Sequence, residues 1–307
     1  MFEHMLMNRR KFMKGAGVVA TSAALAGCGS TTSSDAGGGS SSSGSSGSTT
    51  ATTAEGYTLV EDGKLTLISN FAFPPFEFAD ENTGEYKGFD VDVANAIAGK
   101  LNLELNILPT VQFDTIVPTI KQGGKADISL AAITITDDRK KEAAFTEPYL
   151  DSNQSFVVKA DATDKTIAAL NVSGKKIAVQ SGTTGEAWAQ ENMASATIVP
   201  LDDIVQAMSG VQTGLYDACV ADLPVTSYMI SQSYSDLMIP DGVYSTSSNP
   251  TGGQIPTGEQ YGAILKQDNT ALIDAVNDAF DDLWDEGTMD SIQTTWFGEV
   301  ICSKPSE

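Results

Sequence analysis

Three short polar segments contain residue types that could hold a small charged molecule. Arg139 follows the Ile-Thr-Ile-Thr segment 133–136, a Ser-Gly-Thr-Thr segment spans 181–184, and Asp222 follows an apolar run. A guanidinium suits a carboxylate, helix N-termini favour anions, and a carboxylate can accept from an ammonium group. Each feature also has an ordinary alternative. Arg139 could be a surface arginine, segment 181–184 a capped loop, and Asp222 a helix N-cap.

Histidine chemistry is not expected. His4 is the one histidine in the 307 residues, and it precedes the export segment described below. A Ser/His/Asp or Cys/His system and a His-ligated metal are therefore excluded from the mature chain, and we expect no cofactor and no metal. The formal charge of −22, from 18 Lys and Arg against 40 Asp and Glu, disfavours binding to nucleic-acid phosphates.

The N-terminus indicates export and anchoring. A basic cluster at 8–14 precedes an apolar run at 15–27, which is too short to span a bilayer as a helix. The Leu-Ala-Gly-Cys sequence ending at Cys28 resembles the lipobox of bacterial lipoproteins, which implies lipidation of Cys28; a hydrophobic helix of the fold is the alternative. Arg9 and Arg10 also resemble a twin-arginine signal, and an ordinary export signal remains open. We assign 1–27 to the signal and 28–56 to the lipidated cysteine and a flexible Gly/Ser/Thr tether.

Beyond the tether, short apolar runs alternate with amphipathic stretches in two similar halves. We predict strands at 64–69, 103–108, 127–131, 176–180, 197–200 and 217–221. Helices are predicted from Asp90 as N-cap, at 114–122, 185–192 and 202–210, after Pro224, and over 269–297 with a break at Gly287. The alternation predicts an α/β fold with parallel sheets covered by helices on both faces. Two copies favour two lobes over a single large sheet.

Ligands of open parallel sheets bind beyond the carboxyl ends of the strands. Three such segments follow predicted strands and span 70–78, 132–139 and 180–185. The motifs along the folded part are Pro-Pro-Phe-Glu-Phe at 74–78, Gly-Phe-Asp-Val-Asp at 88–92, Asp-Ile-Ser at 127–129 with Ile-Thr-Ile-Thr-x-x-Arg at 133–139, Phe-x-x-Pro-Tyr at 145–149, Gln-Ser-Gly-Thr-Thr at 180–184 and Trp-Phe-Gly at 296–298. In this order, from Leu65 to Gly298, the chain resembles the amino-acid-binding extracellular solute-binding proteins (family 3) of ATP-driven importers.

This resemblance implies a two-lobed, type II periplasmic-binding-protein-like fold whose lobes have parallel-rich sheets and are joined by two hinge segments. Lobe 1 is expected to comprise 57–149 plus 261–307, and lobe 2 to comprise 150–260. The hinges are expected near 150–156 and 257–261. Closure of the lobes over the ligand is the mechanism that the family implies.

The resemblance also implies the site. The ligand carboxylate is expected to meet Arg139, Thr134, Thr183 and Thr184, and the ligand ammonium to meet Asp222, Ala132 and Thr134. The ligand side chain is expected to face Asn70, Phe73, Phe113, Gln180 and Ala221, although Phe113 could be plain core. Because Asn70 and Gln180 are neutral, a polar uncharged L-amino acid is predicted.

We therefore expect a monomeric, lipid-anchored protein at the outer face of the cytoplasmic membrane that delivers an amino acid to an ABC permease. One alternative is an enzyme on the same fold, such as a dehydratase using Asp222 or Glu259 as acid or base. Another is a ligand-sensing partner of a membrane receptor. Cys219 and Cys302 are expected to be unpaired, since a central strand and a short tail hold them.

Overall fold

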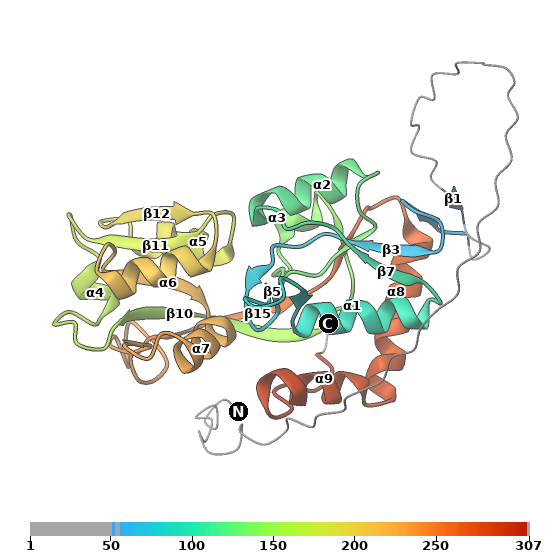
Figure 1. Ribbon diagram of the computed structural model, residues 1–307. Coiled ribbons are helices and arrows are strands. Elements are labelled where there is room, and N and C mark those ends of the chain that lie inside the picture. The colour runs from blue at the N-terminus through green and yellow to red at the C-terminus, as the bar shows by residue number, and fades with distance from the viewer. Residues whose placement is uncertain (1–50, 53–55, 306–307) are drawn as a thin grey trace, which may run out of the picture. The chain divides into compact units, whose positions relative to one another are not determined.

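The computed structural model describes residues 51–52 and 56–305 of the chain (Figure 1). The predicted export signal, Cys28 and most of the tether lie outside these residues. None of the helices in the described part combines the length and apolar character that a membrane span needs. Both described cysteines are free thiols, Cys219 buried and Cys302 partly exposed.

A five-stranded sheet forms the centre of lobe 1. Its order is β7 (Glu104–Ile107), β3 (Lys64–Leu67), β8 (Ile128–Ser129), β16 (Ile264–Leu265) and β9 (Ala144–Phe145). β3 pairs in parallel with β7 and β8, whereas β16 pairs antiparallel with β8 and β9. The helices of this lobe are α1 (Phe89–Lys100), the 3₁₀ turn η1 (Phe113–Thr115), α2 (Ile116–Gln122), α3 (Asp137–Lys140), α8 (Thr270–Asp285) and α9 (Thr288–Phe297).

A six-stranded sheet forms the centre of lobe 2. Its strands are β12 (Thr197–Leu201), β11 (Lys176–Gln180), β13 (Ala218–Asp222), β10 (Leu150–Lys159), β14 (Leu237–Met238) and β15 (Gln254–Tyr261). β11 pairs in parallel with β12 and β13, and β10 pairs antiparallel with β13, β14 and β15. The helices of this lobe are α4 (Ile167–Leu170), α5 (Thr184–Asn192), α6 (Ile204–Thr213) and α7 (Leu223–Gln232).

Both sheets are therefore mixed. In each, the three parallel strands are those of the predicted β-α-β-α-β half. The antiparallel strands β9, β10, β15 and β16 lie in or beside the segments in which the chain passes between lobes, and β14 follows α7 within lobe 2. Strand–helix alternation in the sequence does not reveal these pairings. Smaller pieces are the sheet β4 (Ala72–Phe73), β5 (Glu77–Ala79), β6 (Tyr86–Lys87) and the pair β1 (Ala51–Thr52), β2 (Thr58–Leu59).

Two long strands, β10 and β15, run side by side between the lobes (Figure 1). Their register runs from Leu150 opposite Tyr261 to Ser155 opposite Gln254, with a shift between Ser152 and Gln154. The side chain of Asn153 fills this irregularity by accepting from the backbone N–H groups of residues 257 and 258, both at 3.0 Å. Both strands overlap the predicted hinge segments. An irregular ladder bends more readily than a regular one, so we expect rotation here.

The C-terminal helices agree with the prediction from helical spacing. The buried residues of α8 are those of the predicted apolar face: Leu272, Val276, Ala279, Phe280 and Leu283. Gly287 has φ 73° and separates α8 from α9, a conformation that glycine adopts without strain. The other predicted helices and strands begin and end within three residues of the observed bounds.

The prediction that Asp90 caps a helix is wrong. α1 begins at Phe89, its N-cap is Gly88, and no side chain caps it. The Asp90 side chain is instead fully buried and turned to the interior. Its Oδ2 accepts from the backbone N–H of Ala132 at 2.7 Å and from the hydroxyl of Tyr149 at 2.9 Å. A capping position and a buried acceptor look alike in sequence because both need a short carboxylate near a helix start.

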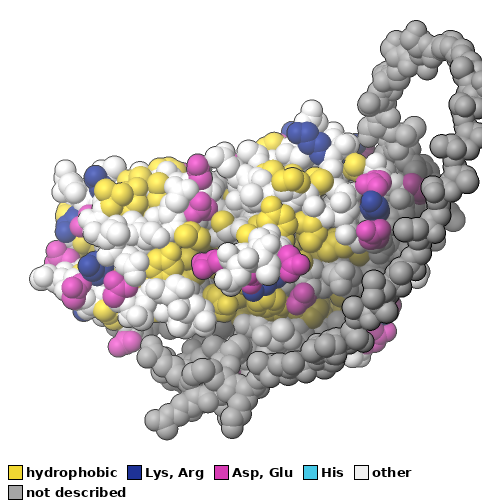
Figure 2. Space-filling model, in the orientation of Figure 1, with side chains coloured by type: hydrophobic (Ala, Val, Ile, Leu, Met, Phe, Trp, Pro, Cys, Tyr) yellow, Lys and Arg dark blue, Asp and Glu magenta, His cyan; other side chains and the backbone are white. Residues whose placement is uncertain are grey.

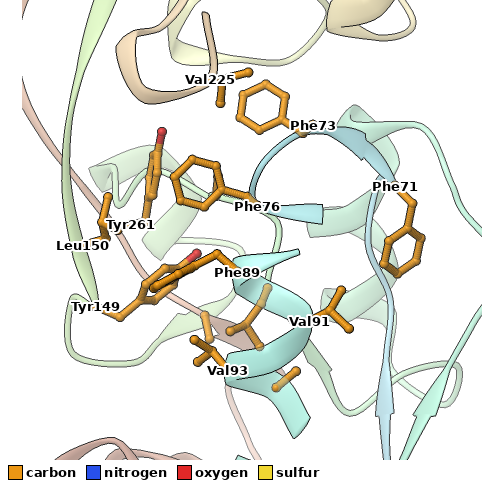
Figure 3. Close-up of a cluster of buried hydrophobic side chains, with 14 of the residues drawn as sticks. Phe71, Phe73, Phe76, Phe89, Val91, Val93, Tyr149, Leu150, Val225 and Tyr261 are labelled. Carbon is orange, nitrogen blue, oxygen red and sulfur yellow. The ribbon is translucent and has the colours of Figure 1, made fainter. Parts of the chain in front are cut away.

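Aromatic side chains join lobe 1 to the hinge strands (Figure 3). The Phe76 ring packs edge-on against Tyr261, with centroids 5.4 Å apart, and Tyr149 lies 6.3 Å from Tyr261. On the other side of Phe76, Figure 3 shows Phe73 next to Val225 of lobe 2. These buried contacts hold the hydroxyl of Tyr261 at a fixed place between the lobes.

Charged side chains on the face shown in Figure 2 are scattered. Asp and Glu side chains, and the few of Lys and Arg, form isolated spots among apolar and neutral groups. Several lysines are paired, for example Lys100 with Glu286 at 2.6 Å and Lys175 with Asp217 at 3.0 Å. This face therefore lacks the basic stripe that nucleic-acid binding needs.

Two buried carboxyl groups lie together behind the aromatic cluster. Glu77 is completely buried, and burial and the neighbouring Asp90 raise its pKa well above the usual value. Burial also raises the pKa of Asp90 to about 6, against hydrogen bonds from Ala132, Tyr149 and Glu77. A neutral Glu77 avoids placing a second buried negative charge beside Asp90.

The protonation of Glu77 predicts how stability depends on pH. The folded state holds a proton that the unfolded chain releases above pH 4.5, so the free energy of unfolding falls as pH rises through this range. Glu77→Gln mimics the neutral carboxyl. Its stability relative to wild type should rise with pH above 4.5, by up to about 1.4 kcal/mol per pH unit while folded wild type keeps Glu77 protonated, measured by chemical denaturation. Exposed Glu81→Gln is the control, and parallel curves for Glu77→Gln and wild type would refute a protonated Glu77.

Candidate functional site

A small cavity lies between the lobes and is lined from both sides. Its lining residues are Phe73, Phe113, Ala132, Thr134 and Arg139 from lobe 1, and Gln180, Thr183, Thr184 and Asp222 from lobe 2. These are the residues predicted for ligand contact, apart from Asn70 and Ala221. Asn70 lies behind Gln180, and Ala221 is buried with its carbonyl accepting from Ser155 Oγ at 2.7 Å.

Arg139 reaches across the cavity from α3. Thr136 caps this short helix by accepting from the Arg139 N–H at 3.2 Å. The guanidinium donates to the carbonyl of Thr134 at 2.8 Å and to that of Gly182 in lobe 2 at 2.9 Å. It also lies over the Phe113 ring, 5.4 Å from the centroid. Three contacts thus fix the plane of the guanidinium at the cavity wall.

A glycine at position 182 is needed for the two lobes to come as close as they do beside Arg139. Its φ is +77°, and a Cβ there would lie 2.8 Å from the Cβ of Asp114 in lobe 1. Any larger residue would hold the lobes apart at this point and pull the Gly182 carbonyl away from Arg139.

The start of α5 faces Arg139 from lobe 2. Thr183 is the N-cap: its Oγ1 accepts from the Glu186 N–H at 3.1 Å and donates to the Gln180 carbonyl at 2.8 Å. Its hydroxyl is thus engaged in capping. The Thr184 hydroxyl lies 3.4 Å from that of Thr134, a direct contact between the lobes. The positive end of a helix, with a hydroxyl beside it, therefore lies opposite the guanidinium.

Asp222 is held by both hinge strands. Gln154 of β10 donates from Nε2 to Asp222 Oδ1 at 2.7 Å, and the hydroxyl of Tyr261 of β15 donates to Oδ2. Ser152 Oγ donates in turn to the Tyr261 hydroxyl at 2.9 Å. Asp222 occupies the N-cap position of α7, but its side chain makes no capping bond. Its carboxylate is therefore directed to the cavity and the hinge.

A second carboxylate lies beside Asp222. The second N–H of the Gln154 amide donates to Glu259 Oε2 at 2.8 Å, and Thr184 Oγ1 lies 3.2 Å from the same nitrogen. Burial, then the charge of Glu259, raises the pKa of Asp222 to about 7, against Tyr261, Gln154 and Arg139. Burial lowers the pKa of Arg139, although Asp222 and Glu259 oppose this. Two acids, the buried Asp222 and the partly exposed Glu259, face one guanidinium and leave room for one more positive charge.

Ala132 presents its backbone to the cavity in an unusual conformation. Its φ is +46°, in the left-handed region that non-glycine residues seldom adopt. The bond from its N–H to Asp90 holds it there. Such strain persists only where the surroundings over-determine it, so the Glu77–Asp90 pair supports the wall of the site from behind.

Sequence reasoning missed several members of this site. Gln154, Tyr261 and Ser152 lie within the predicted hinges, and Asp90 lies in the motif at 88–92. The sequence pattern does not place any of these four residues near the ligand. The period-two placement of polar Ser152 and Gln154 on a buried strand is the signal that could have found them.

The architecture and the site together define a class of protein. Two α/β lobes, joined by paired strands, bring a guanidinium and a carboxylate from opposite sides to one cavity, as in two-lobed binding proteins for small solutes. A family model confirms the class. It matches residues 65–299, and the chain belongs to the bacterial extracellular solute-binding proteins, family 3; it is accordingly an exported protein.

Individual relatives agree with this membership. The L-cystine-binding protein TcyJ of Escherichia coli is 26% identical over 78% of this chain and 85% of its own. A structure described as an ancestral arginine-binding protein bound to glutamine is 33% identical, covers 78% of this chain and 100% of its own, and has a TM-score of 0.68. The ancestral amino-acid-binding protein AncCDT-1, described as a precursor of cyclohexadienyl dehydratase, is 31% identical, with 76% and 96% coverage and a TM-score of 0.67.

The paired acids predict a measurable titration. Glu259→Gln removes a like charge while its amide oxygen can still accept from Gln154. The pKa of Asp222, about 7 in wild type, should therefore fall. The carboxyl carbon shift of Asp222, followed by NMR against pH in the ligand-free protein, measures it. Glu299→Gln, an exposed change, is the control. An unchanged Asp222 titration in Glu259→Gln would show that the two acids do not interact.

Proposed function

We propose that this protein binds a free L-amino acid outside the cytoplasmic membrane and delivers it to an ABC-type permease. One observation supports this above all: Arg139 of lobe 1 and Asp222 of lobe 2 line the same cavity. An amino acid at neutral pH has a carboxylate and an ammonium group, and a site that removes both from water must offer a partner to each. The pair of opposite charges, one per lobe, meets that need.

The proposed contacts follow from the chemistry of each wall. Arg139, the Thr134 and Thr184 hydroxyls and the N–H groups at the start of α5, including that of Thr183, receive the carboxylate. Asp222, the Ala132 carbonyl and Thr134 receive the ammonium group. Because the Thr183 hydroxyl is used in capping, we assign that residue a backbone role.

Ligand binding is proposed to drive closure. The carboxylate and ammonium partners lie on different lobes, so an amino acid binds the closed form more tightly than the open one and shifts the population toward it. The proposed boundaries are 57–149 plus 261–307 for lobe 1 and 150–260 for lobe 2. Bending is assigned to the β10–β15 pair near 150–156 and 257–261.

For the ligand side chain we propose a polar, uncharged group. The neutral residues Phe73, Phe113 and Gln180 line the cavity, and Asn70 stands behind Gln180. Several relatives are named for charged or neutral amino acids alike, such as arginine and glutamine, so the family does not decide this point. The absence of charge on these walls, among the described residues, favours a neutral side chain.

The cellular setting is proposed from the sequence. Lipidation of Cys28 anchors the protein at the outer face of the cytoplasmic membrane, and the tether gives it reach to the permease. We propose a monomer that needs no cofactor.

A second candidate function is catalysis. Asp222, with a pKa near 7 and Glu259 beside it, has the character of a general acid or base, and AncCDT-1 is described as an enzyme precursor. We favour binding without catalysis because Gln154 and Tyr261 already engage both oxygens of Asp222. Turnover of prephenate or a related acid by the purified protein would overturn this choice.

The carboxylate assignment predicts the effect of one substitution. The thermal unfolding midpoint of wild type should rise with at least one of the twenty L-amino acids, because a ligand that binds the folded state stabilises it. Arg139→Ala should weaken that binding by about 100-fold or more, because the ligand carboxylate is left buried without its partner. The measurement is the shift in midpoint at matched ligand concentrations.

Lys140→Ala provides the control, since Lys140 is the exposed cation next to Arg139. It should keep the full shift. An undiminished shift in Arg139→Ala, or loss of the shift in Lys140→Ala, contradicts the assignment.

A further inference from the structure

One buried polar atom at the cavity has no partner among the described residues. Gln180 is 2% exposed, it lines the cavity, and its Oε1 makes no hydrogen bond. Leaving a buried acceptor without a hydrogen bond destabilises the folded protein, so such atoms are rare unless another group donates to them.

The orientation of this amide is fixed by its neighbours. Asn70 donates from Nδ2 to the carbonyl of Val111 at 2.6 Å, and a carbonyl can only accept. The Asn70 Oδ1 must then point the other way, where it accepts from Gln180 Nε2 at 3.0 Å. Because the amide nitrogen of Gln180 is turned to Asn70, its oxygen is the atom left over. The Val111 carbonyl thus fixes the orientation of the Asn70 amide, and the Asn70 amide fixes the orientation of the Gln180 amide.

We propose that Gln180 Oε1 receives an N–H donor from the ligand side chain, and that this side chain ends in a carboxamide, as in L-glutamine or L-asparagine. This inference rests on the proposed amino-acid binding and names the class of ligand. Asn70 acts as a positioning residue: it does not line the cavity but decides which end of Gln180 faces it.

The charges of the site select among donors. Asp222 is the one carboxylate among the cavity-lining residues, and it is assigned to the α-ammonium group. No lining carboxylate remains for a guanidinium or a second ammonium, whereas a neutral amide needs none. A ligand carboxylate, in contrast, places two acceptors against Gln180 Oε1, and a thioether offers no donor.

The experiment compares three ligands of similar length. Binding of L-glutamine, L-glutamate and L-methionine to the full chain is measured by calorimetry, after the thermal screen of all twenty L-amino acids. Wild type should bind L-glutamine about 10- to 100-fold more tightly than the other two, because only L-glutamine satisfies the acceptor.

Two variants distinguish the role of the acceptor, Gln180, from that of Asn70, which orients it. Gln180→Met keeps the length of the side chain but removes the acceptor, so the preference for L-glutamine over L-methionine should fall about 10-fold or more. Asn70→Leu releases the Gln180 amide to rotate and offer its nitrogen. The preference for L-glutamine over L-glutamate should then fall, while binding itself persists, an effect that loss of packing alone does not produce.

The outcomes are distinct. If no amino acid binds, the proposed function fails and this inference with it. If an apolar amino acid, L-glutamate or L-arginine binds most tightly, or if Gln180→Met keeps the wild-type preference, this inference is overturned and the proposed function stands. The inference is supported if the preference for L-glutamine over L-methionine falls in Gln180→Met and the preference for L-glutamine over L-glutamate falls in Asn70→Leu.

Discussion

The structure depends on holding two opposite charges in a buried space that belongs to two separate bodies. Taking an ion out of water is costly unless hydrogen bonds and an opposite charge replace the water. Arg139 is held by the carbonyls of Thr134 and Gly182, and Asp222 by Gln154 and Tyr261. Uncharged partners keep each ion in place without neutralising it. Both charges are therefore available to the zwitterion that we propose as the ligand.

Asp222, the residue proposed to bind the ligand ammonium group, is hydrogen-bonded to the strands proposed as the hinge. Gln154 and Ser152 belong to β10, and Tyr261 belongs to β15, so both hydrogen bonds to the Asp222 carboxylate come from the strands that we propose as the hinge. Phe76 packs on Tyr261 and ties this network to lobe 1. A change of charge at Asp222 therefore acts on groups whose positions define the angle between lobes. This gives a physical route from ligand binding to closure.

Much of this arrangement could be predicted from the sequence. The apolar face of α8 and the strand–helix order follow from periodicity, and the cavity lining follows from motifs in register with a known family. These features are local, or are transferred position by position. The antiparallel strands β10 and β15 could not be predicted in the same way, since their pairing joins segments about a hundred residues apart.

The role of Asp90 is a second feature that could not be predicted from the sequence. Its place at a helix start is local, but whether it caps the helix or binds Ala132 depends on a segment that only the folded chain brings near. The orientation of the Gln180 amide likewise depends on tertiary contacts, because the Val111 carbonyl orients Asn70 and Asn70 orients Gln180. Residue type and spacing identify candidates, while the direction of a hydrogen bond is a property of the tertiary structure.

We propose that the two lobes bind the carboxylate and the ammonium group of the same amino acid. The most direct test of this proposal uses the amino acid that binds best together with two analogues, the amine that lacks its carboxylate and the acid that lacks its ammonium group. Calorimetric titration should give tight binding for the intact amino acid and at least 100-fold weaker binding for each analogue. An analogue that binds within about 10-fold of the amino acid would contradict a grip on both ends.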